Sequence, residues 1–423
     1  MIMRILMISP SQIPGTTGDV IRVQELSKAL NQLGHKIFVV CPNYEERNRG
    51  GSPFRSKRID PFIDGPDDKI DISVDRINLY FIKKLMVGKS LLWRLIWFSF
   101  FNSLSLQKVI RICLRNRPHA IISYTPYAAI PAYIASQFFR KPWIHDARGI
   151  IRIEFYETER VKPNRVSAYL VGLMESHVLR KASAIIVVSE KMKKILLEMY
   201  SLDQKRIVVG EDGVDPDAFN PSLGRNAVRG KFSIEKSEKV ILFLGTLSIR
   251  EGVDRLIRAM SYVIKVRNDV KLLIVGGGSL LVNFSSEFKD LVRNLSIEKY
   301  VTFTGKVPHS EAPQYIADSD ICVSPHISTA FIPLKVFEYL ACGKPVIVTG
   351  PNTDIGEILA RHRAGLTVNT ENPLELAKSI LFLLTQPETS KKLGENGYKL
   401  VIENFTWKHS AKKIENLISE LSH

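Results

Sequence analysis

The sequence predicts two α/β domains, each built on a parallel sheet covered by helices. The chain has 423 residues, 45% of them hydrophobic, which is too long for one ordinary core and long enough for two. Two regions, one starting at residue 3 and one at residue 239, open with an apolar run that leads into a glycine turn. Strands that alternate with helical patterns indicate parallel sheets, because a parallel crossover needs a connection of helix length.

The positive charge of the chain is unevenly placed. The formal net charge is +16, and residues 1–180 carry +12 of it. Such a field favours acidic partners, namely nucleic acid, anionic lipid headgroups or a phosphorylated substrate. The basic residues form no RNA- or DNA-binding motif that we recognise, so we expect no nucleic acid among the partners.

The cysteines and the apolar runs indicate the cellular compartment. Four scattered cysteines without paired spacing predict neither a disulfide framework nor a zinc site. No run reaches the ~18 to 20 apolar residues that a membrane-spanning helix needs. The apolar opening at residues 3–8 ends at Ser9-Pro10 without a small-residue cleavage site, and we interpret it as a strand rather than a signal peptide. We expect a cytoplasmic protein.

The first domain begins with a strand, a glycine turn, a helix and a second strand. The strands are expected at residues 3–8 and 36–41, and the helix at 20–30. The turn contains Gly18, where the backbone can approach a ligand closely and a helix start offers amide donors to phosphate. A plain tight turn would give the same pattern, and both interpretations stay open.

The next part of the first domain is less regular. Residues 42–75 are polar and lack periodicity, so we expect a surface loop, followed by a strand at Ile77–Phe81. Leu91–Phe101 is the most apolar stretch, and lysines and arginines flank it. A helix that is apolar all round is typical of a core, whereas aromatic residues with basic flanks are typical of a membrane interface. One face can pack on the sheet while the other meets lipid.

Further strands are expected at Ala120–Tyr124, near Trp143 and at residues 184–190, with a helix at 165–181 before the last of them. His145 ends the second of these strands. A lone histidine is usually structural, because either ring nitrogen is easily satisfied in a core. Ligands of open α/β sheets nevertheless gather at the carboxyl ends of strands, which makes His145 a candidate for binding.

The second domain has strand patterns near residues 239–245, 272–278, 301–307 and 320–325. The stretch that follows, Ile332–Val348, reads as a helix that feeds a buried strand. Pro333 suits a helix start, and Lys335 and Glu338 lie three residues apart on one face. A lysine beside the free amides of a helix start favours phosphate, and a glutamate one turn on suits the hydroxyls of a ribose. The alternative is an ordinary ion pair on a solvated face.

The wording Pro-x-Lys-x-x-Glu-Tyr-x-Ala-x-Gly-Lys-Pro-Val at residues 333–346 resembles the donor site of the retaining glycosyltransferases of family four. The resemblance implies the GT-B fold: two Rossmann-like domains that face each other across a cleft, with a C-terminal helix crossing back to the first. The domains implied are 1–205 on the acceptor side and 237–404 on the donor side. They are joined by an interdomain segment, 206–236, and followed by the crossover helix, 405–423.

The resemblance also implies roles for individual residues. Glu338 would hold the ribose of a nucleotide sugar, while Lys335 and Gly18 would bind its diphosphate. His145 is the best match to a histidine that hydrogen-bonds the transferred sugar. Asp146 and Arg148 would line the acceptor side.

The chain departs from the family pattern at several donor-site positions. Many members carry a first glutamate where this chain has Ala330. Behind Gly245 the family has Arg next and Lys six residues on, and this chain has Thr246 and Glu251 there. Arg250 is a candidate substitute, although neighbouring residues of a helix point about 100° apart.

The reaction implied is retaining transfer of a sugar from a UDP- or GDP-sugar to a saccharide or lipid-linked acceptor, without a metal ion or other cofactor. The basic first domain suggests an acceptor at an anionic membrane surface, as in bacterial surface polysaccharide assembly. Two alternatives stay open. One is a GT-B enzyme that epimerises or hydrolyses a nucleotide sugar, and the other is a catalytically degenerate nucleotide-sugar binding protein.

Overall fold

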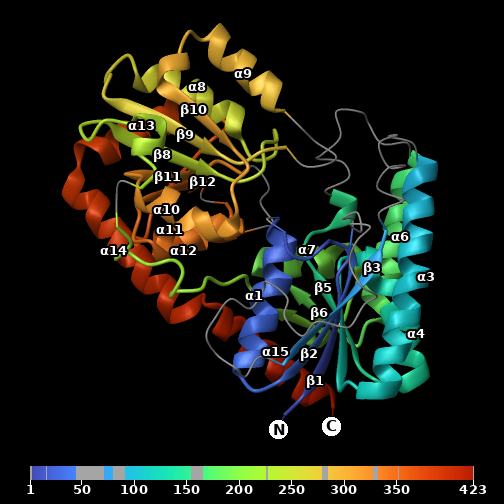
Figure 1. The fold of residues 1–423 in the computed structure, drawn as a ribbon. Coiled ribbons are helices and arrows are strands. Elements are labelled where there is room, and N and C mark those ends of the chain that lie inside the picture. Colours follow the sequence, from blue (N-terminus) through green and yellow to red (C-terminus); the bar gives the residue numbers. More distant parts are fainter. Residues whose placement is uncertain are drawn as a thin grey trace, which may run out of the picture. The chain divides into compact units, whose positions relative to one another are not determined.

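A computed structural model describes residues 2–15, 17–43, 71–79, 91–153, 165–224, 227–278, 284–326, 332–350 and 352–422. The chain forms two compact units (Figure 1). The N-terminal unit comprises Met1–Glu211 and Trp407–His423, and the C-terminal unit comprises Asp212–Thr406.

The N-terminal unit is a parallel sheet with the strand order β3-β2-β1-β4-β5-β6-β7 in the part that the structure describes. The strands are β1 Arg4–Ile8, β2 Lys36–Asn43, β3 Ile72–Asn78, β4 Ala120–Tyr124, β5 Trp143–Ala147, β6 Ala184–Val187 and β7 Ile207–Val209. From β1 the chain runs outward to β2 and β3, and it then returns to β4 on the other side of β1. Loops that follow β1 and β4 therefore diverge at a topological switch point, where open α/β sheets bind ligands.

Helices cover both faces of this sheet. They are α1 Gly18–Gln32, α3 Leu91–Asn116, α4 Ala129–Phe139, α6 Arg165–Lys181, α7 Glu190–Tyr200 and α15 Trp407–Leu421. Figure 1 shows α1 and α15 on one face, with α3, α4 and α6 on the other. Because both faces are covered, every residue of β4, β5 and β6 is buried, without the alternation of a half-exposed strand.

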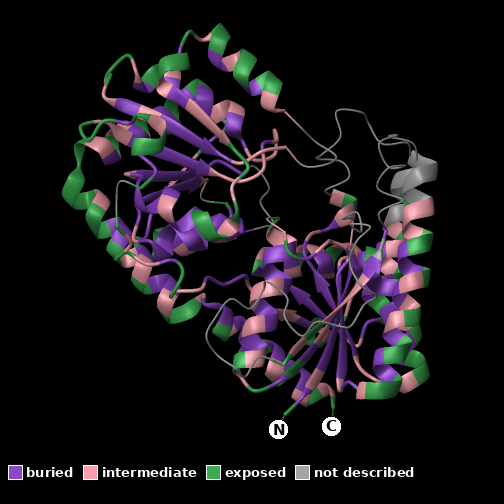
Figure 2. Ribbon diagram, in the orientation of Figure 1, coloured by how far each residue is buried: buried purple, intermediate pink, exposed green. Residues whose placement is uncertain are grey.

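The C-terminal unit is a second parallel sheet, whose described strands follow the order β10-β9-β8-β11-β12-β13. They are β8 Lys239–Leu244, β9 Val270–Val275, β10 Val301–Gly305, β11 Ile321–Ser324, β12 Val346–Thr349 and β13 Leu366–Val368. The helices are α8 Val253–Val263, α9 Ser285–Asn294, α10 Ala312–Ala317, α11 Leu334–Ala341, α12 Asp354–His362, α13 Pro373–Thr385 and α14 Pro387–Asn404. Figure 2 shows the strands as the buried layer of each unit. The switch point lies between β8 and β11.

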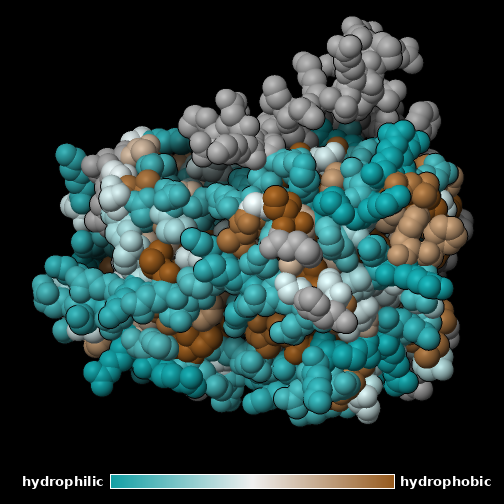
Figure 3. All heavy atoms as spheres, turned by 90° about the horizontal axis from the view of Figure 1, so that it is seen from below, coloured by the Kyte–Doolittle hydropathy of each residue, from teal (hydrophilic) through white to brown (hydrophobic). Residues whose placement is uncertain are grey.

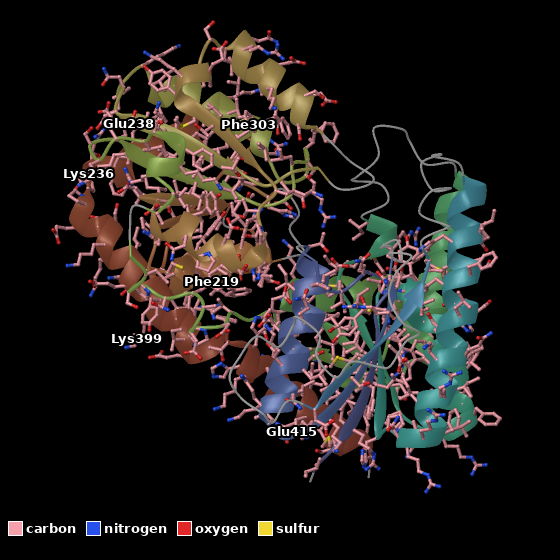
Figure 4. The ribbon with its side chains drawn as sticks, viewed as in Figure 1. Phe219, Lys236, Glu238, Phe303, Lys399 and Glu415 are labelled. Carbon is pink, nitrogen blue, oxygen red and sulfur yellow. The ribbon has the colours of Figure 1, made fainter. Side chains whose placement is uncertain are left out.

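The C-terminal helix α15 belongs to the N-terminal unit, as predicted. His35 immediately precedes β2, and its Nε2 atom lies 3.1 Å from Oε1 of Glu415, a residue labelled in Figure 4. Ser410 Oγ donates to the carbonyl oxygen of Glu211 at 2.7 Å. These contacts attach the last helix to the segment between α1 and β2 and to the segment after β7.

The expected interdomain segment, residues 206–236, is shared between the two units. Its first residues form β7, which pairs with β6 in the first sheet. Val228 and Ile234 instead lie in the apolar core of the C-terminal unit. The chain passes from one unit to the other at Glu211 and Asp212, and it returns at Thr406 and Trp407.

The prediction was wrong about where β3 begins. The expected loop 42–75 includes its first residues, and the expected strand Ile77–Phe81 overlaps only its end. Residues 44–70 and 80–81 lie outside the described part. β3 pairs with β2 at the edge of the sheet, where charged residues such as Asp75 and Arg76 are tolerated, so the apolar signal of a strand is weak there.

The apolar stretch Leu91–Phe101 opens α3, and the side chains of residues 91–95 lie outside the described part. Phe101 is buried, whereas its neighbour Phe100 is exposed. The stretch therefore has one face in the core and one in solvent. None of the described helices is long and apolar enough to cross a membrane.

Candidate functional site

The candidate donor site lies at the switch point of the C-terminal unit. The loop after β8 begins at Gly245, and the loop after β11 contains His326. The two loops meet where Glu251 Oε1 lies 3.9 Å from His326 Nε2. Helix α11 starts beside them and carries Lys335 and Glu338.

Helix α11 is buried along its whole length. The helix begins at Leu334. Pro333, predicted as its first residue, is the N-cap that precedes it, with φ −65°. Lys335 is 7% exposed and Glu338 is 3% exposed. The alternative of an ion pair between them on a solvated face is therefore wrong, since each is buried and each pairs with a different residue.

The ammonium of Lys335 is held in a fixed place. Its Nζ donates to Glu251 Oε2 and lies 4.4 Å from the centroid of the Phe243 ring. Gly245 has φ +148°, and a Cβ added there would lie 2.8 Å from Nζ. The backbone conformation favours glycine at position 245, and any larger residue there would push against the Lys335 ammonium.

Glu251 stands between positive groups. Its burial alone would raise the pKa of the carboxyl group, but the charges of Lys335, His326 and Arg250 more than offset this effect and lower the pKa. Glu251 is therefore an anion at neutral pH. Arg250 is half-buried in the turn that precedes α8, so the helix spacing that we considered for it does not apply.

Glu338 is paired with a histidine that the sequence analysis missed. His309 Nε2 lies 2.6 Å from Glu338 Oε1. The His309 ring also packs on Phe219, with 5.5 Å between centroids; Figure 4 labels Phe219. His309 follows the carboxyl end of β10, and this position was the only signal in the sequence that could have indicated it.

Tyr339 positions the loop that carries Gly245. The backbone amide of Leu244, the last residue of β8, donates to Tyr339 Oη at 2.8 Å. Burial raises the pKa of the Tyr339 hydroxyl well above its ordinary value, so the group stays neutral. Helix α11 and the end of β8 are thereby held at a fixed spacing.

Gly18 lies at the switch point of the N-terminal unit. It is the first residue of α1, which follows β1, and Thr17 is the N-cap without a side-chain hydrogen bond. A Cβ at Gly18 would contact nothing within 4 Å. The helix start therefore offers backbone amides beside open space, which suits an anion.

His145 is 1% exposed in β5. Its Nδ1 lies 3.1 Å from Ser123 Oγ, which also accepts a hydrogen bond from Trp143 Nε1. The buried Nε2 atom has no hydrogen-bond partner in the described structure. Desolvation lowers the pKa of His145 to about 3, so the ring is neutral.

This burial predicts an acid-sensitive stability. As the pH falls from 6.5, the ordinary pKa of histidine, toward 3, His145 becomes protonated in the unfolded chain but stays neutral in the folded one. Its contribution is therefore complete above pH 6.5 and is lost on acidification, with a slope of up to about 1.4 kcal/mol per pH unit. His145→Gln should flatten that slope in urea titrations at several pH values, and exposed His362→Gln should not. Equal slopes in wild type and His145→Gln would contradict the assignment.

The neighbours of His145 are buried as well. Arg22 Nε donates to Asp146 Oδ2 at 2.8 Å, and both side chains are fully buried. Arg148 is also buried. The C-terminal unit thus holds four of the predicted site residues around α11, namely Gly245, Arg250, Lys335 and Glu338. The N-terminal unit holds Gly18 and His145. Ala330 lies outside the described residues.

Comparisons with known proteins agree with this geometry. Residues 17–218 match the family Glycosyltransferase Family 4, and residues 224–400 match Glycosyl transferases group 1. Sucrose-phosphate synthase from Thermosynechococcus elongatus, a GT-B protein, is similar in fold over 99% of both chains, with a TM-score of 0.78 and 20% identity. Together these matches support a GT-B glycosyltransferase.

Another fold relative has a ligand. HepE from Anabaena, in a complex with UDP and glucose, has a TM-score of 0.75 and 17% identity over 99% of this chain and 100% of that one. The likeness shows that this chain shares its fold with a protein that holds a nucleotide and a sugar.

Curated relatives are also glycosyltransferases. The D-inositol 3-phosphate glycosyltransferase of Gordonia bronchialis is 29% identical over 291 residues, which is 66% of this chain and 60% of that protein. An uncharacterized glycosyltransferase of Methanocaldococcus jannaschii is 26% identical over 250 residues, 58% of this chain and 62% of that protein. The chain thus spans about three fifths of the length of these relatives.

Proposed function

We propose that this protein is a glycosyltransferase of family four, of the Pro-x-Lys-x-x-Glu variety. It moves a sugar from a UDP- or GDP-sugar to a saccharide or lipid-linked acceptor, with retention at the anomeric carbon and without a metal ion. One observation carries the proposal: Lys335 and Glu338 are buried on α11 at the switch point of the C-terminal sheet. Buried charged residues at the carboxyl ends of the strands of a parallel sheet are typical of a ligand site.

Each residue has a chemical role in this proposal. Glu338, oriented by His309, accepts hydrogen bonds from the ribose hydroxyls. Lys335, Arg250 and the amides at Gly18 neutralise the charge that develops on the departing diphosphate. His145 orients the transferred sugar through its Nε2 atom, whose lack of a partner supports this role. Retention follows when the acceptor attacks from the face that the diphosphate leaves, and the enzyme supplies orientation.

A transfer assay tests the proposal. Purified protein is incubated with UDP- and GDP-sugars and a lipid-linked or free saccharide, with and without EDTA, and the anomeric configuration of the product is read by NMR. The expected result is an acceptor-dependent product of unchanged configuration, also in EDTA. Consumption of the donor without acceptor would instead indicate an epimerase or hydrolase. Binding without any turnover would indicate a degenerate binding protein.

The surface of the N-terminal unit supports an acceptor held at the cytoplasmic face of an anionic membrane, as in surface polysaccharide biosynthesis. Exposed large apolar residues gather on three helices: Phe100, Ile110 and Leu114 on α3, Ile130, Ile134 and Phe138 on α4, and Tyr169, Leu170 and Leu173 on α6. Arg111, Arg115 and Arg140 are exposed on or beside α3 and α4. Seen from below in Figure 3, apolar surface lies on the right, where Figure 1 has α3 and α4. Apolar contact and positive charge together favour anionic lipid.

Liposome sedimentation tests the membrane surface. The protein should bind vesicles that contain anionic lipid at low salt and dissociate as salt rises, because surface charges are then screened. Phe138→Ser, at a residue 77% exposed on α4, should weaken binding several-fold. Val266→Ser is the matched control in the C-terminal unit, at a residue 69% exposed. Equal binding to neutral and anionic vesicles, or none at low salt, would contradict the proposal.

A further inference from the structure

Glu251 is an anion placed where the donor site needs positive charge. It comes six residues after Gly245 and just before α8. Its Oε2 accepts from Lys335 Nζ, and its Oε1 lies 3.9 Å from His326 Nε2. The cation that would meet a phosphate therefore already has a counterion from the chain itself.

The turn that carries Glu251 is fixed in place. Gly252 has φ +70°, and a Cβ there would lie 2.2 Å from the carbonyl oxygen of Pro325. The turn is thus packed against the loop after β11, and this contact fixes the backbone from which the Glu251 side chain, 18% exposed, reaches Lys335. Lys335 is equally confined, by Phe243 and Gly245. A phosphate that reaches Lys335 must therefore share the ammonium with the Glu251 carboxylate.

We propose that Glu251 competes with the phosphates of the ligand for Lys335. It thereby lowers the affinity of the site most for the most highly charged nucleotide, the nucleoside diphosphate product. This inference rests on the proposed function. A terminal phosphate loses its second proton near pH 6, so at pH 7 the free diphosphate carries about one more negative charge than the sugar nucleotide. A fixed carboxylate therefore weakens the binding of product more than that of donor, and it favours product release.

The contact also makes the prediction specific. Glu251→Gln keeps an oxygen that can accept from Lys335, but it removes the negative charge. We expect the variant to bind the nucleoside diphosphate about tenfold more tightly or better, because a like charge beside the phosphates is gone. The sugar nucleotide and the nucleoside monophosphate, which each carry about one negative charge less at pH 7, should gain less. In turnover, product inhibition should become stronger while the KM for the donor changes little.

The chain offers a matched control. Glu238, labelled in Figure 4, precedes β8 at the opposite end of the strand from Gly245. Its side chain is 17% exposed, against 18% for Glu251, and it also has a lysine partner, Lys271, at 3.5 Å. Glu238→Gln makes the same change of charge at similar burial, and it should leave all three nucleotide affinities unchanged.

Isothermal calorimetry with the full chain tests the inference. Affinities for the monophosphate, the diphosphate and the sugar nucleotide are measured for wild type, Glu251→Gln, Glu238→Gln, Lys335→Met and the double variant Glu251→Gln/Lys335→Met. The gain from Glu251→Gln should shrink when Lys335 is absent, since the competition acts through the ammonium. Glu251→Asp, which keeps the charge, should stay close to wild type and serves if Glu251→Gln fails to fold.

Two results would overturn the inference. Weaker diphosphate binding by Glu251→Gln would mean that Glu251 supports the ligand, and an equal gain for all three nucleotides would mean that phosphate charge is not what it opposes. Both outcomes differ from a failure of the proposed function, in which the wild-type protein binds none of the nucleotides.

Discussion

Replacing Arg22 with methionine should lower the free energy of unfolding of the N-terminal unit by about 3 to 5 kcal/mol, because it leaves a buried carboxylate without its counterion. Arg22 and Asp146 are both fully buried. Arg22 Nη2 also donates to the carbonyl oxygen of Gly210 at 2.9 Å, and Nη1 donates to that of Glu211 at 3.2 Å. Urea titration should report the loss, and the melting temperature should fall by roughly 6 to 20 °C.

Two further variants serve as controls for Arg22→Met. Lys28→Met breaks a more exposed pair with Glu25, in which the lysine side chain is 39% exposed, and should cost less than about 0.5 kcal/mol. Arg22→Met combined with Asp146→Leu removes both charges and should recover much of the stability, since paired apolar replacement of a buried ion pair is often neutral. A single variant as stable as wild type would show that water reaches Asp146.

Glu338→Ala should weaken binding of the nucleoside diphosphate at least about 100-fold, because each lost hydrogen bond from a ribose hydroxyl to a carboxylate contributes roughly 1.5 to 3 kcal/mol. The wild-type protein should also bind the 2′,3′-dideoxy analogue much more weakly than the natural nucleotide. In Glu338→Ala this discrimination should vanish. Calorimetry or the shift of the melting temperature with ligand measures both effects.

The control for Glu338→Ala is Glu403→Ala. Glu403 is 57% exposed on α14, and its Oε1 atom lies 4.0 Å from Lys399 Nζ. His309→Gln keeps a donor to Glu338 and should retain most of the discrimination, whereas His309→Phe should lose part of it. Undiminished discrimination in a folded Glu338→Ala protein would exclude Glu338 from the ribose site.

Local sequence signals predicted the elements whose patterns are strong. Ala120–Tyr124 and residues 165–181 have the predicted ends, because an uninterrupted apolar run and a long amphipathic run each have a clear period. The edge strand β3 was misplaced, because its charged residues weaken that period. In the site, Lys335 and Glu338 could be assigned to one helix from their spacing and wording.

Their partners could not be predicted in the same way. Glu251 is 84 residues from Lys335, and His309 is 29 residues from Glu338. No local pattern encodes such pairs, since they arise only when neighbouring strands bring their loops to one edge of the sheet. In the sequence, Glu251 indicated only that the lysine of the family pattern is missing. The fold shows that Glu251 forms an ion pair with Lys335, a lysine that the site retains.

The place of α15 in the N-terminal unit has a consequence for how the chain is made. A ribosome releases residues 212–406 before residues 407–423, although the latter complete the first sheet's helical cover. The backbone amide of Val214 donates to the carbonyl oxygen of Phe405 at 3.0 Å, so the two ends of the C-terminal unit close on each other. That unit can therefore finish folding during synthesis, while the first-made unit must wait for the last helix before it is complete.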